Sequence, residues 1–327
     1  MNTSIIAVLG AGSWGTAMAI HLAKHGYKVL LWGRDLHKIA EYQRAHRNTH
    51  YLPQSIFPPL LEPVAELEIC QAQATDLLLA IPSHGFANLI KRLKRPASGI
   101  AWLTKGLNPE DNALLSEVVF KHWGPGYPIA IVSGPSFAAE VVAGLPTAVT
   151  LASNNADYQH RFQKLLHHDN FRVYLSRDLI GVQLCGAVKN VIAIACGVSD
   201  GLGYGANARA ALITRGLAEM WRLGQKMGAE EDTFLGLAGV GDTILTCTDN
   251  QSRNRRFGLL LGQGKTMAQA ELEIGQVVEG RQNTQQVCAL ADFYKIDMPI
   301  CNQVNLLLKN LIDAHQAVTN LMRRAVN

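Results

Sequence analysis

A lysine lies inside an apolar helical stretch of the chain. In the segment CGAVKNVIAIACGV, residues 185–198, apolar side chains cover most of the circumference of a helix, and only Lys189 is charged. A helix that is apolar on nearly all sides is expected in a protein core. There an unpaired ammonium group is costly and its pKa falls, so a buried lysine can act as acid and base near neutral pH. The alternative is that the side chain extends along its own stem to the surface.

A second group of residues has the spacing of a nucleotide-binding turn. In VLGAGSWGTAMA, the residues Gly10, Gly12 and Gly15 follow a strand-like run and open a helical pattern. The first glycine permits a tight turn, the second lets the backbone approach a pyrophosphate, and the third lets helix and strand pack closely. The helix N-terminus adds free amides and a partial positive charge. We expect a dinucleotide site here; the alternative is a glycine-rich turn without a ligand.

The residues after the second strand-like run bear on the choice of nicotinamide cofactor. A carboxylate at this place binds the ribose 2′-hydroxyl of NAD, whereas an arginine pairs with the 2′-phosphate of NADP. The sequence LLWGRD offers both, because Arg34 follows the small Gly33 and Asp35 lies 20 residues beyond Gly15. We give Arg34 the greater weight, which favours NADP(H) over NAD(H).

Three further stretches hold groups that bind anions or move protons. LTKGLNP places Lys105 after one strand-like run, SGPSFAAE places Ser136 after another, and GVGD places Asp242 in a glycine-flanked turn. The GVGD stretch is followed by the run SRNRR. These residues also have structural alternatives: Lys105 as a solvated loop lysine, Asp242 as a helix N-cap, and the SRNRR run as a solvated basic turn. In the binding interpretation that run supplies a compact set of anion donors, Ser252, Arg253 and Asn254.

The elements that must position these groups are short runs rich in β-branched residues. They span residues 4–10, 28–32, 76–82, 99–106, 128–134, 147–153 and 171–176. Several are apolar on both faces, and helical patterns fall between the early ones, which predicts a parallel doubly wound sheet covered by helices on both sides. After Arg177 the strand pattern stops. We therefore expect an α/β fold, with a Rossmann-type dinucleotide-binding domain at 1–177, an all-α substrate and catalytic domain at 178–327, and the substrate in the cleft between them.

The composition narrows the class of protein. Lys and Arg number 30 against 26 for Asp and Glu, a surplus too small to indicate nucleic-acid binding. The apolar runs are broken before the ~20 residues that a membrane span needs, so we expect no membrane insertion. The N-terminus has no charged region ahead of an apolar run and enters the glycine motif at once, so we expect no signal peptide. Six cysteines show no CxxC spacing, which favours reduced thiols in a cytoplasmic protein.

Histidine spacing gives a weak metal signal. His21 with His25, and His46 with His50, have the i, i+4 spacing of a metal-ligand pair. Neither pair has an evident third ligand in the sequence, and the run His167-His168-Asp169 is typical of a surface turn. We therefore expect no metal site.

Together these motifs resemble the NAD(P)-dependent glycerol-3-phosphate dehydrogenases of the bacterial type. The matching segments occur in order from the first strand to about residue 300: GAGSWGTA, TKG, SGPSFA, AVKNVIAIACG, GVGD (for the common GLGD), SRNRRFG and VVEG. The resemblance implies interconversion of sn-glycerol 3-phosphate and dihydroxyacetone phosphate, which supplies the backbone of phospholipids. It also implies a homodimer.

The resemblance assigns a role to each matching residue. Lys189 becomes the catalytic acid and base. Its pKa is expected to be lowered by burial and by Lys105, while an adjacent Asp242 would oppose this and orient the amine. The substrate contacts implied are Lys105, Gly134, Ser136, Lys189, Asp242, Ser252, Arg253 and Asn254. The cofactor contacts are Gly10, Gly12, Ser13, Trp14, Gly15, Arg34, Lys105, Ala138, Arg253, Val277 and Glu279.

Two other functions fit parts of the sequence. A related two-domain dehydrogenase acting on a 3-hydroxyacid would need a clamp for a carboxylate instead of a phosphate. A non-catalytic NADPH-sensing protein would keep the glycine turn but would have no need of Lys189 with Asp242.

Overall fold

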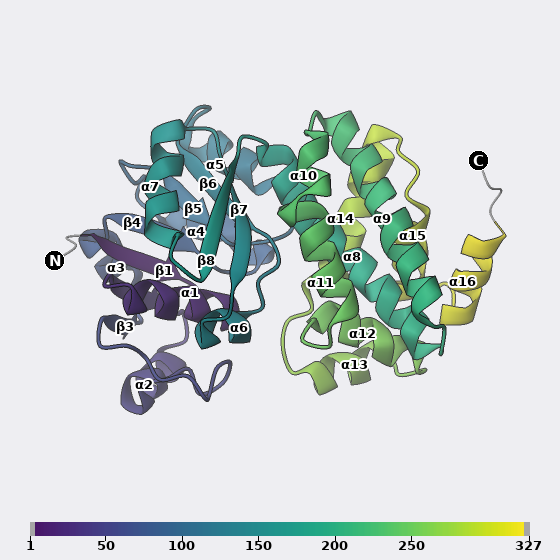
Figure 1. Cartoon of the computed structure of the whole chain (residues 1–327), viewed down its shortest axis with the longest axis horizontal. Coiled ribbons are helices and arrows are strands. Elements are labelled where there is room, and N and C mark those ends of the chain that lie inside the picture. Colours follow the sequence, from purple (N-terminus) through teal and green to yellow (C-terminus); the bar gives the residue numbers. More distant parts are fainter. Residues whose placement is uncertain (1–3, 324–327) are drawn as a thin grey trace. The chain divides into compact units, whose positions relative to one another are not determined.

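The chain forms two compact units, described for residues 4–323 in a computed structural model (Figure 1). The first unit contains the residues up to Lys105 together with Leu115–Leu179. The second contains Gly106–Leu114 and the residues from Ile180 onward. Inside the second unit, Gln286 Nε2 donates a hydrogen bond to the carbonyl oxygen of Leu107 at 2.8 Å. The single domain boundary near residue 177 that the sequence predicts would assign Gly106–Leu114 to the first unit, whereas this segment belongs to the second.

The first unit is built on one eight-stranded sheet of order β3-β2-β1-β4-β5-β6-β7-β8. All neighbouring strands pair in parallel except β6 and β7. The order changes direction between β1 and β4, the place where such sheets bind ligands beyond their carboxyl ends. The expected Rossmann-type fold is confirmed. The strands are β1 (Ile5–Leu9), β2 (Lys28–Trp32), β3 (Leu61–Val64), β4 (Asp76–Leu79), β5 (Ile100–Trp102), β6 (Ile129–Ser133), β7 (Thr147–Ser153) and β8 (Phe171–Ser176).

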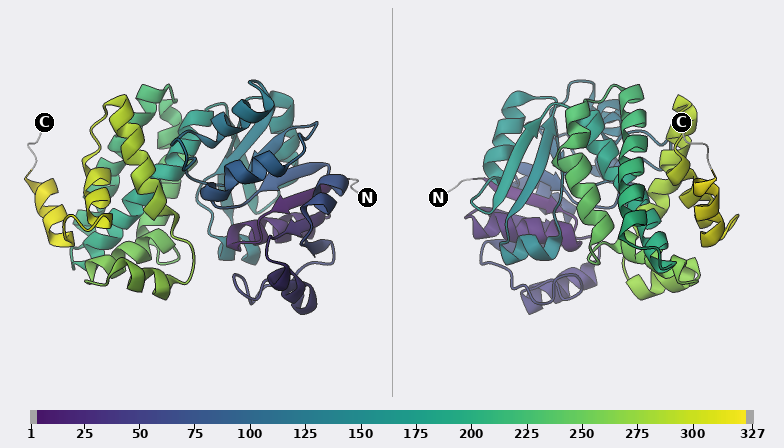
Figure 2. Two further views of the ribbon diagram at one scale, coloured as in Figure 1. Left: turned by 180° about the vertical axis from the view of Figure 1, so that it is seen from behind. Right: turned by 45° about the vertical axis from the view of Figure 1, so that its right-hand side comes forward.

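Helices cover both faces of this sheet. Alternate strand residues such as Ile6 and Val8 form one core with residues of α1, α6 and α7. Seen from behind, α3, α4 and α5 lie in front of the opposite face (Figure 2). The helices of this unit are α1 (Ser13–Lys24), α2 (Leu36–Ala45), α3 (Leu67–Gln73), η1 (Ser83–Gly85), α4 (Phe86–Arg92), α5 (Leu115–Trp123), α6 (Ala138–Ala143) and α7 (Ala156–Leu166).

Two features of the sheet differ from the sequence prediction. Strand β3, with the sequence LEPV, is not among the predicted strands, because a proline and a glutamate interrupt its short apolar pattern. Strand β7 runs antiparallel to β6, so the sheet is not wholly parallel. The connection between them contains only the six-residue α6, about 9 Å of helix, whereas a parallel crossover usually carries the chain back along the whole strand.

All the secondary-structure elements of the second unit are helices, as expected, and its segment Gly106–Leu114 contains neither helix nor strand. Its central helix α8 (Leu179–Gly201) is buried over most of its length. This helix is long and apolar enough to cross a membrane, but 83% of its most apolar window is buried inside the protein. The other helices are α9 (Ala206–Met227), α10 (Glu231–Leu235), η2 (Leu237–Gly241), α11 (Asp242–Thr248), α12 (Arg253–Gly262), α13 (Met267–Ile274), α14 (Glu279–Tyr294), α15 (Pro299–Leu308) and α16 (Ala314–Met322).

Glycines bring the backbones of α8 and α12 into direct contact. A Cβ on Gly197 of α8 would lie 2.1 Å from the carbonyl oxygen of Arg255, and one on Gly258 of α12 would lie 2.1 Å from that of Ile194. Gly201 and Gly262 repeat the arrangement one turn further on. Since no side chain separates the two helices here, the start of α12 is held at a fixed place beside α8.

We expect Gly258→Ala to destabilise the protein by about 1–3 kcal/mol, because overpacking of this size forces the backbones apart. The free energy of unfolding from urea denaturation measures the effect. Gly85→Ala is the matched control, since a Cβ there would meet its nearest atom at an ordinary 3.6 Å. Equal stability of the two variants would show that the α8–α12 contact is not close-packed.

Candidate active site

The glycine turn after β1 leaves open space at the N-terminus of α1. Gly10 has a φ of +134° and lies against the end of β4, where a Cβ would be 2.4 Å from the carbonyl oxygen of Ala80. Gly15 packs on the turn itself, since its Cβ would be 2.0 Å from the Gly10 oxygen. Gly12 has no atom within 4 Å of its Cβ position and makes no side-chain cap for α1. The backbone amides of the first turn, at Ser13 and Trp14, therefore lie at an uncapped helix N-terminus that suits a phosphate.

The two residues that bear on cofactor choice have different roles in the structure. The Asp35 carboxylate is the N-cap of α2 and accepts hydrogen bonds from the amides of His37 and Lys38, both at 3.1 Å. Arg34 is exposed directly after β2. Because the carboxylate is engaged by its own helix, the guanidinium is the side chain at this strand end that suits a ribose phosphate.

Three predicted residues of the first unit meet at one carbonyl group. Lys105 Nζ donates to the carbonyl oxygen of Gly134 at 3.4 Å, and Ser136 Oγ donates to the same oxygen at 2.9 Å. Gly134 has a φ of +149°, and a Cβ there would lie 2.9 Å from the Cα of Val149. Lys105 and Gly134 follow the neighbouring parallel strands β5 and β6, so they lie at the same carboxyl edge of the sheet.

Lys189 is buried in the second unit and paired. Only 6% of the residue is exposed, so the side chain does not extend to solvent. Its Nζ donates to Asp242 Oδ1 at 2.6 Å and to Thr246 Oγ1 at 2.8 Å. These two hydrogen bonds offset the free energy lost when the ammonium group is buried. A carboxylate at this distance also stabilises the charged form of the lysine. Asp242 thus opposes the effect of burial; Lys105 belongs to the first unit, and its effect on Lys189 stays a prediction.

The partner of the lysine is positioned by an unusual turn. The residues before Asp242 form η2, a π-helical turn, and Asp242 is the first residue of α11. Turns of this kind are frequent at functional sites. Asp242 does not cap the helix, since its carboxylate binds Lys189. Thr246 is one helical turn further on, and its hydroxyl donates to the Asp242 carbonyl at 2.6 Å. Sequence reasoning missed Thr246, although its i, i+4 spacing from Asp242 places both on one face.

A chain of amide hydrogen bonds connects the neighbour of Lys189 to the starts of α12 and α14. Asn254 Nδ2 donates to Asn190 Oδ1 at 2.9 Å, and the Gly280 amide donates to Asn254 Oδ1 at 2.9 Å. Arg253, which precedes Asn254, is the first residue of α12. Glu279, which precedes Gly280, is the first residue of α14. Both are partly exposed. Asn190 was not singled out from the sequence.

The basic run of α12 is not a solvated turn. Ser252 is buried and caps the helix by accepting from the Arg255 amide at 3.2 Å. Arg255 is also buried, and its Nη2 lies 2.5 Å from Asp200 Oδ2. Arg255 therefore fastens the helix, whereas Arg253, the first residue of α12, is partly exposed and suits a ligand.

Trp14, Ala138 and Val277 are the remaining predicted residues. Trp14 and Ala138 are partly buried against the core of the first unit, at the starts of α1 and α6. Val277 is 49% exposed in the second unit, ahead of α14. Contacts thus join Lys105 and Ser136 to Gly134 in the first unit, and Lys189 to Asp242 in the second.

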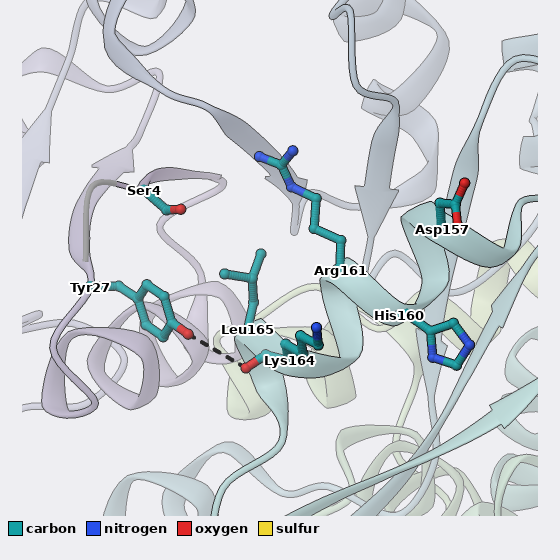
Figure 3. A pocket seen from close by; sticks show the side chains of 7 residues that line it. All are labelled: Ser4, Tyr27, Asp157, His160, Arg161, Lys164 and Leu165. Atoms are coloured by element: carbon teal, nitrogen blue, oxygen red, sulfur yellow. Dashed lines mark hydrogen bonds between the residues drawn. The ribbon is translucent and has the colours of Figure 1, made fainter.

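One cavity of the first unit lies apart from all of these residues. It has a volume of about 520 Å³ and lies beside α7 (Figure 3). Tyr27 Oη donates to the Lys164 carbonyl at its wall, and Arg161 is held by Asp76 at 2.7 Å. It is lined by Ser4, Tyr27, Asp157, His160, Arg161, Lys164 and Leu165, and so contains none of the predicted site residues.

Comparison with known proteins settles the family. Residues 5–159 match the family model for the NAD-dependent glycerol-3-phosphate dehydrogenase N-terminus, and residues 178–319 match that for its C-terminus. The chain belongs to the NAD-dependent glycerol-3-phosphate dehydrogenase family.

Relatives in this family match the chain over nearly its whole length. A glycerol-3-phosphate dehydrogenase [NAD(P)+] of Legionella pneumophila (strain Paris) is 60% identical over 99% of this chain and 98% of that protein. The enzyme of the same name from Serratia proteamaculans is 51% identical over 99% and 97%. The crystal structure of glycerol-3-phosphate dehydrogenase from Coxiella burnetii superposes with a TM-score of 0.95 at 49% identity, covering 98% of this chain and 99% of that one.

Proposed function

We propose that the chain is a glycerol-3-phosphate dehydrogenase that interconverts sn-glycerol 3-phosphate and dihydroxyacetone phosphate with a nicotinamide dinucleotide. The observation that carries this proposal is the buried pair of Lys189 and Asp242, in a chain 60% identical to an enzyme of that name. The first unit supplies the dinucleotide site and the second the acid–base group and the phosphate donors. A purely sensory protein has no use for a buried lysine–carboxylate pair.

The residues of the first unit fit a dinucleotide. The open space at Gly12 and the uncapped amides of α1 suit the pyrophosphate. Trp14 lies in the first turn of α1 and Ala138 is the first residue of α6, and both pack against the core of this unit. When bound, the dinucleotide supplies or accepts the hydride. Lys105, Arg253, Val277 and Glu279 would complete its contacts.

Lys189 would move the proton that accompanies the hydride. In the reduction of dihydroxyacetone phosphate, its ammonium donates a hydrogen bond to the C2 carbonyl oxygen and gives up the proton as the alkoxide forms. In the oxidation, the neutral amine takes the proton of the C2 hydroxyl. Asp242 at 2.6 Å keeps the amine oriented and stabilises its charged form, which suits the reduction.

The substrate phosphate would be held by the start of α12. Arg253 offers a charged fork and Asn254 an amide whose place is fixed by Asn190 and Gly280. Ser252 and the helix N-terminus add donors of the kind that bind phosphate. Lys105, Gly134 and Ser136 would contact the substrate from the first unit.

We expect Arg34→Asp to change cofactor preference. Loss of a charge-assisted hydrogen bond to the 2′-phosphate, worth about 1.5–3 kcal/mol, lowers the ratio of kcat/KM for NADPH over NADH by roughly 10–100-fold. Steady-state kinetics with both cofactors measures the ratio. Arg44→Asp, an exposed arginine of α2, is the matched control. An unchanged ratio in Arg34→Asp would remove Arg34 from the recognition of the cofactor.

The direct test of the function is the oxidation of NADPH with dihydroxyacetone phosphate, run beside NADH and followed at the nicotinamide absorbance. Substrate-dependent oxidation is expected with both cofactors, with the faster reaction for NADPH. A 3-oxoacid such as acetoacetate serves as the competing substrate. Oxidation with acetoacetate alone would indicate a 3-hydroxyacid dehydrogenase, and binding of NADPH without turnover on either substrate would indicate a sensor.

Three wider attributes accompany the proposal. We propose that the enzyme works in the cytoplasm, that its product supplies phospholipid synthesis, and that it acts as a homodimer. All six cysteines lie among the described residues as buried free thiols, which is in keeping with a reducing compartment. Light scattering of the purified chain tests the dimer.

A further inference from the structure

Three histidines of the first unit lie together, away from the glycine turn. His21 and His25 lie at the end of α1, and His168 comes from the connection between α7 and β8. One ring nitrogen of each lies within 4.8 Å of one from each of the others. Of these three histidines, only His21 and His25 are recognisable from the sequence as a possible metal-ligand pair. The third is brought in by the fold, so the run around His168 is more than a surface turn.

The hydrogen bonds of the three rings fix which nitrogen is bare. His21 Nε2 lies 3.0 Å from the carbonyl oxygen of Leu166, His25 Nδ1 lies 2.8 Å from that of His21, and His168 Nε2 lies 3.2 Å from that of Leu165. A carbonyl oxygen only accepts, so each of these nitrogens must carry the hydrogen. The opposite nitrogen of each neutral ring therefore presents a lone pair. Histidine ligands of metals show this pattern of a backbone-bound N–H opposite the coordinating nitrogen.

We propose that His21, His25 and His168 form a site for a divalent transition-metal ion of the zinc type, with water completing the coordination. Imidazole nitrogens are ligands that Zn²⁺, Co²⁺ and Ni²⁺ share, and three histidines with a water form a common zinc arrangement.

The rings need one adjustment to take an ion. His25 and His168 are stacked, with ring centroids 3.7 Å apart and planes inclined by 8°. A metal in the plane of one ring would lie out of the plane of the other, so one must tilt. His25 follows the last turn of α1 and is exposed, which leaves it room to turn. The bound ion would then connect the end of α1 to the residues after α7.

The test is a titration of the full chain, first stripped with a chelator, with Co²⁺ as a spectroscopic probe and Zn²⁺ as a competitor. We expect one Co²⁺ per chain, with the strong visible bands of a four-coordinate ion that Zn²⁺ abolishes, and a higher Tm in the presence of Zn²⁺. His25→Gln and His168→Gln should each weaken binding at least about tenfold and remove the rise in Tm. His160→Gln, an exposed histidine of α7, should change neither.

Several outcomes would overturn the proposal. The first is that the unsubstituted chain with Co²⁺ shows no four-coordinate bands. The second is that the His25→Gln and His168→Gln variants bind Co²⁺ as tightly as the unsubstituted chain. The latter would place the ion elsewhere, for instance at His46 and His50. Far-UV circular dichroism establishes that each variant is folded. Because His25 is exposed, its substitution tests the site even if the variant at the half-buried His168 does not fold.

Discussion

Lys189→Ala is expected to lower turnover by roughly 10²–10⁴-fold, the usual contribution of a positioned acid or base. Binding of NADPH should remain, because the glycine turn and Arg34 belong to the other unit. Steady-state oxidation of NADPH with dihydroxyacetone phosphate gives the turnover, and quenching of protein fluorescence by NADPH gives the binding. Lys226→Ala, which removes an exposed lysine of α9, should retain full activity.

Removal of the lysine also leaves Asp242 buried without its cation, so stability must be separated from catalysis. The double variant Lys189→Ala/Asp242→Ala removes both charges and should recover much of the stability lost in the single variant. Its turnover should stay as low as that of Lys189→Ala. Recovery of turnover together with stability would mean that the lysine supports the fold and takes no part in the reaction.

Asp242→Ala is expected to destabilise the protein by about 3–5 kcal/mol, because it leaves the buried ammonium of Lys189 without its carboxylate. Turnover should fall as well, since the amine loses the group that orients it. Urea denaturation at neutral pH measures the stability, and Asp292→Ala, an exposed aspartate of α14, should change it by less than about 0.5 kcal/mol. A loss below about 1 kcal/mol in Asp242→Ala would contradict a buried, mutually dependent pair.

Much of the fold could be predicted because the sequence carries clear periodicities. The predicted strand-like runs all contain strands. The central parallel strands are buried on both faces and are recognisable as short apolar runs, and β8 shows the alternation of a half-exposed strand. Strand β3 lacked such a run. The antiparallel β7 could not be foreseen, because alternation of strands and helices predicts their order but carries no sign of direction.

The site residues that belong to a sequence motif could be predicted. Those that depend on contacts between segments distant in sequence could not. The residue spacing around Gly10 and around Lys189 can be recognised from the sequence alone. The parts played by Asn190 and Thr246 depend on contacts between helices distant in sequence. Arg255 illustrates the same limit, because a run of three arginines and an asparagine gives no hint that one guanidinium is buried against Asp200. His168 is far from the other two histidines in sequence and lies near them only in the folded chain.

The segment Gly106–Leu114 has a consequence for how the protein can be divided. Leu107 is fully buried and Leu114 is 4% exposed, so a short stretch encoded within the first half contributes apolar side chains to the helical unit. A fragment cut after residue 177 would carry this stretch away and leave the helical remainder with an unfilled interior. Independent expression of the two halves should therefore give an aggregation-prone C-terminal piece, and a soluble one would require residues 106–114 to be grafted back.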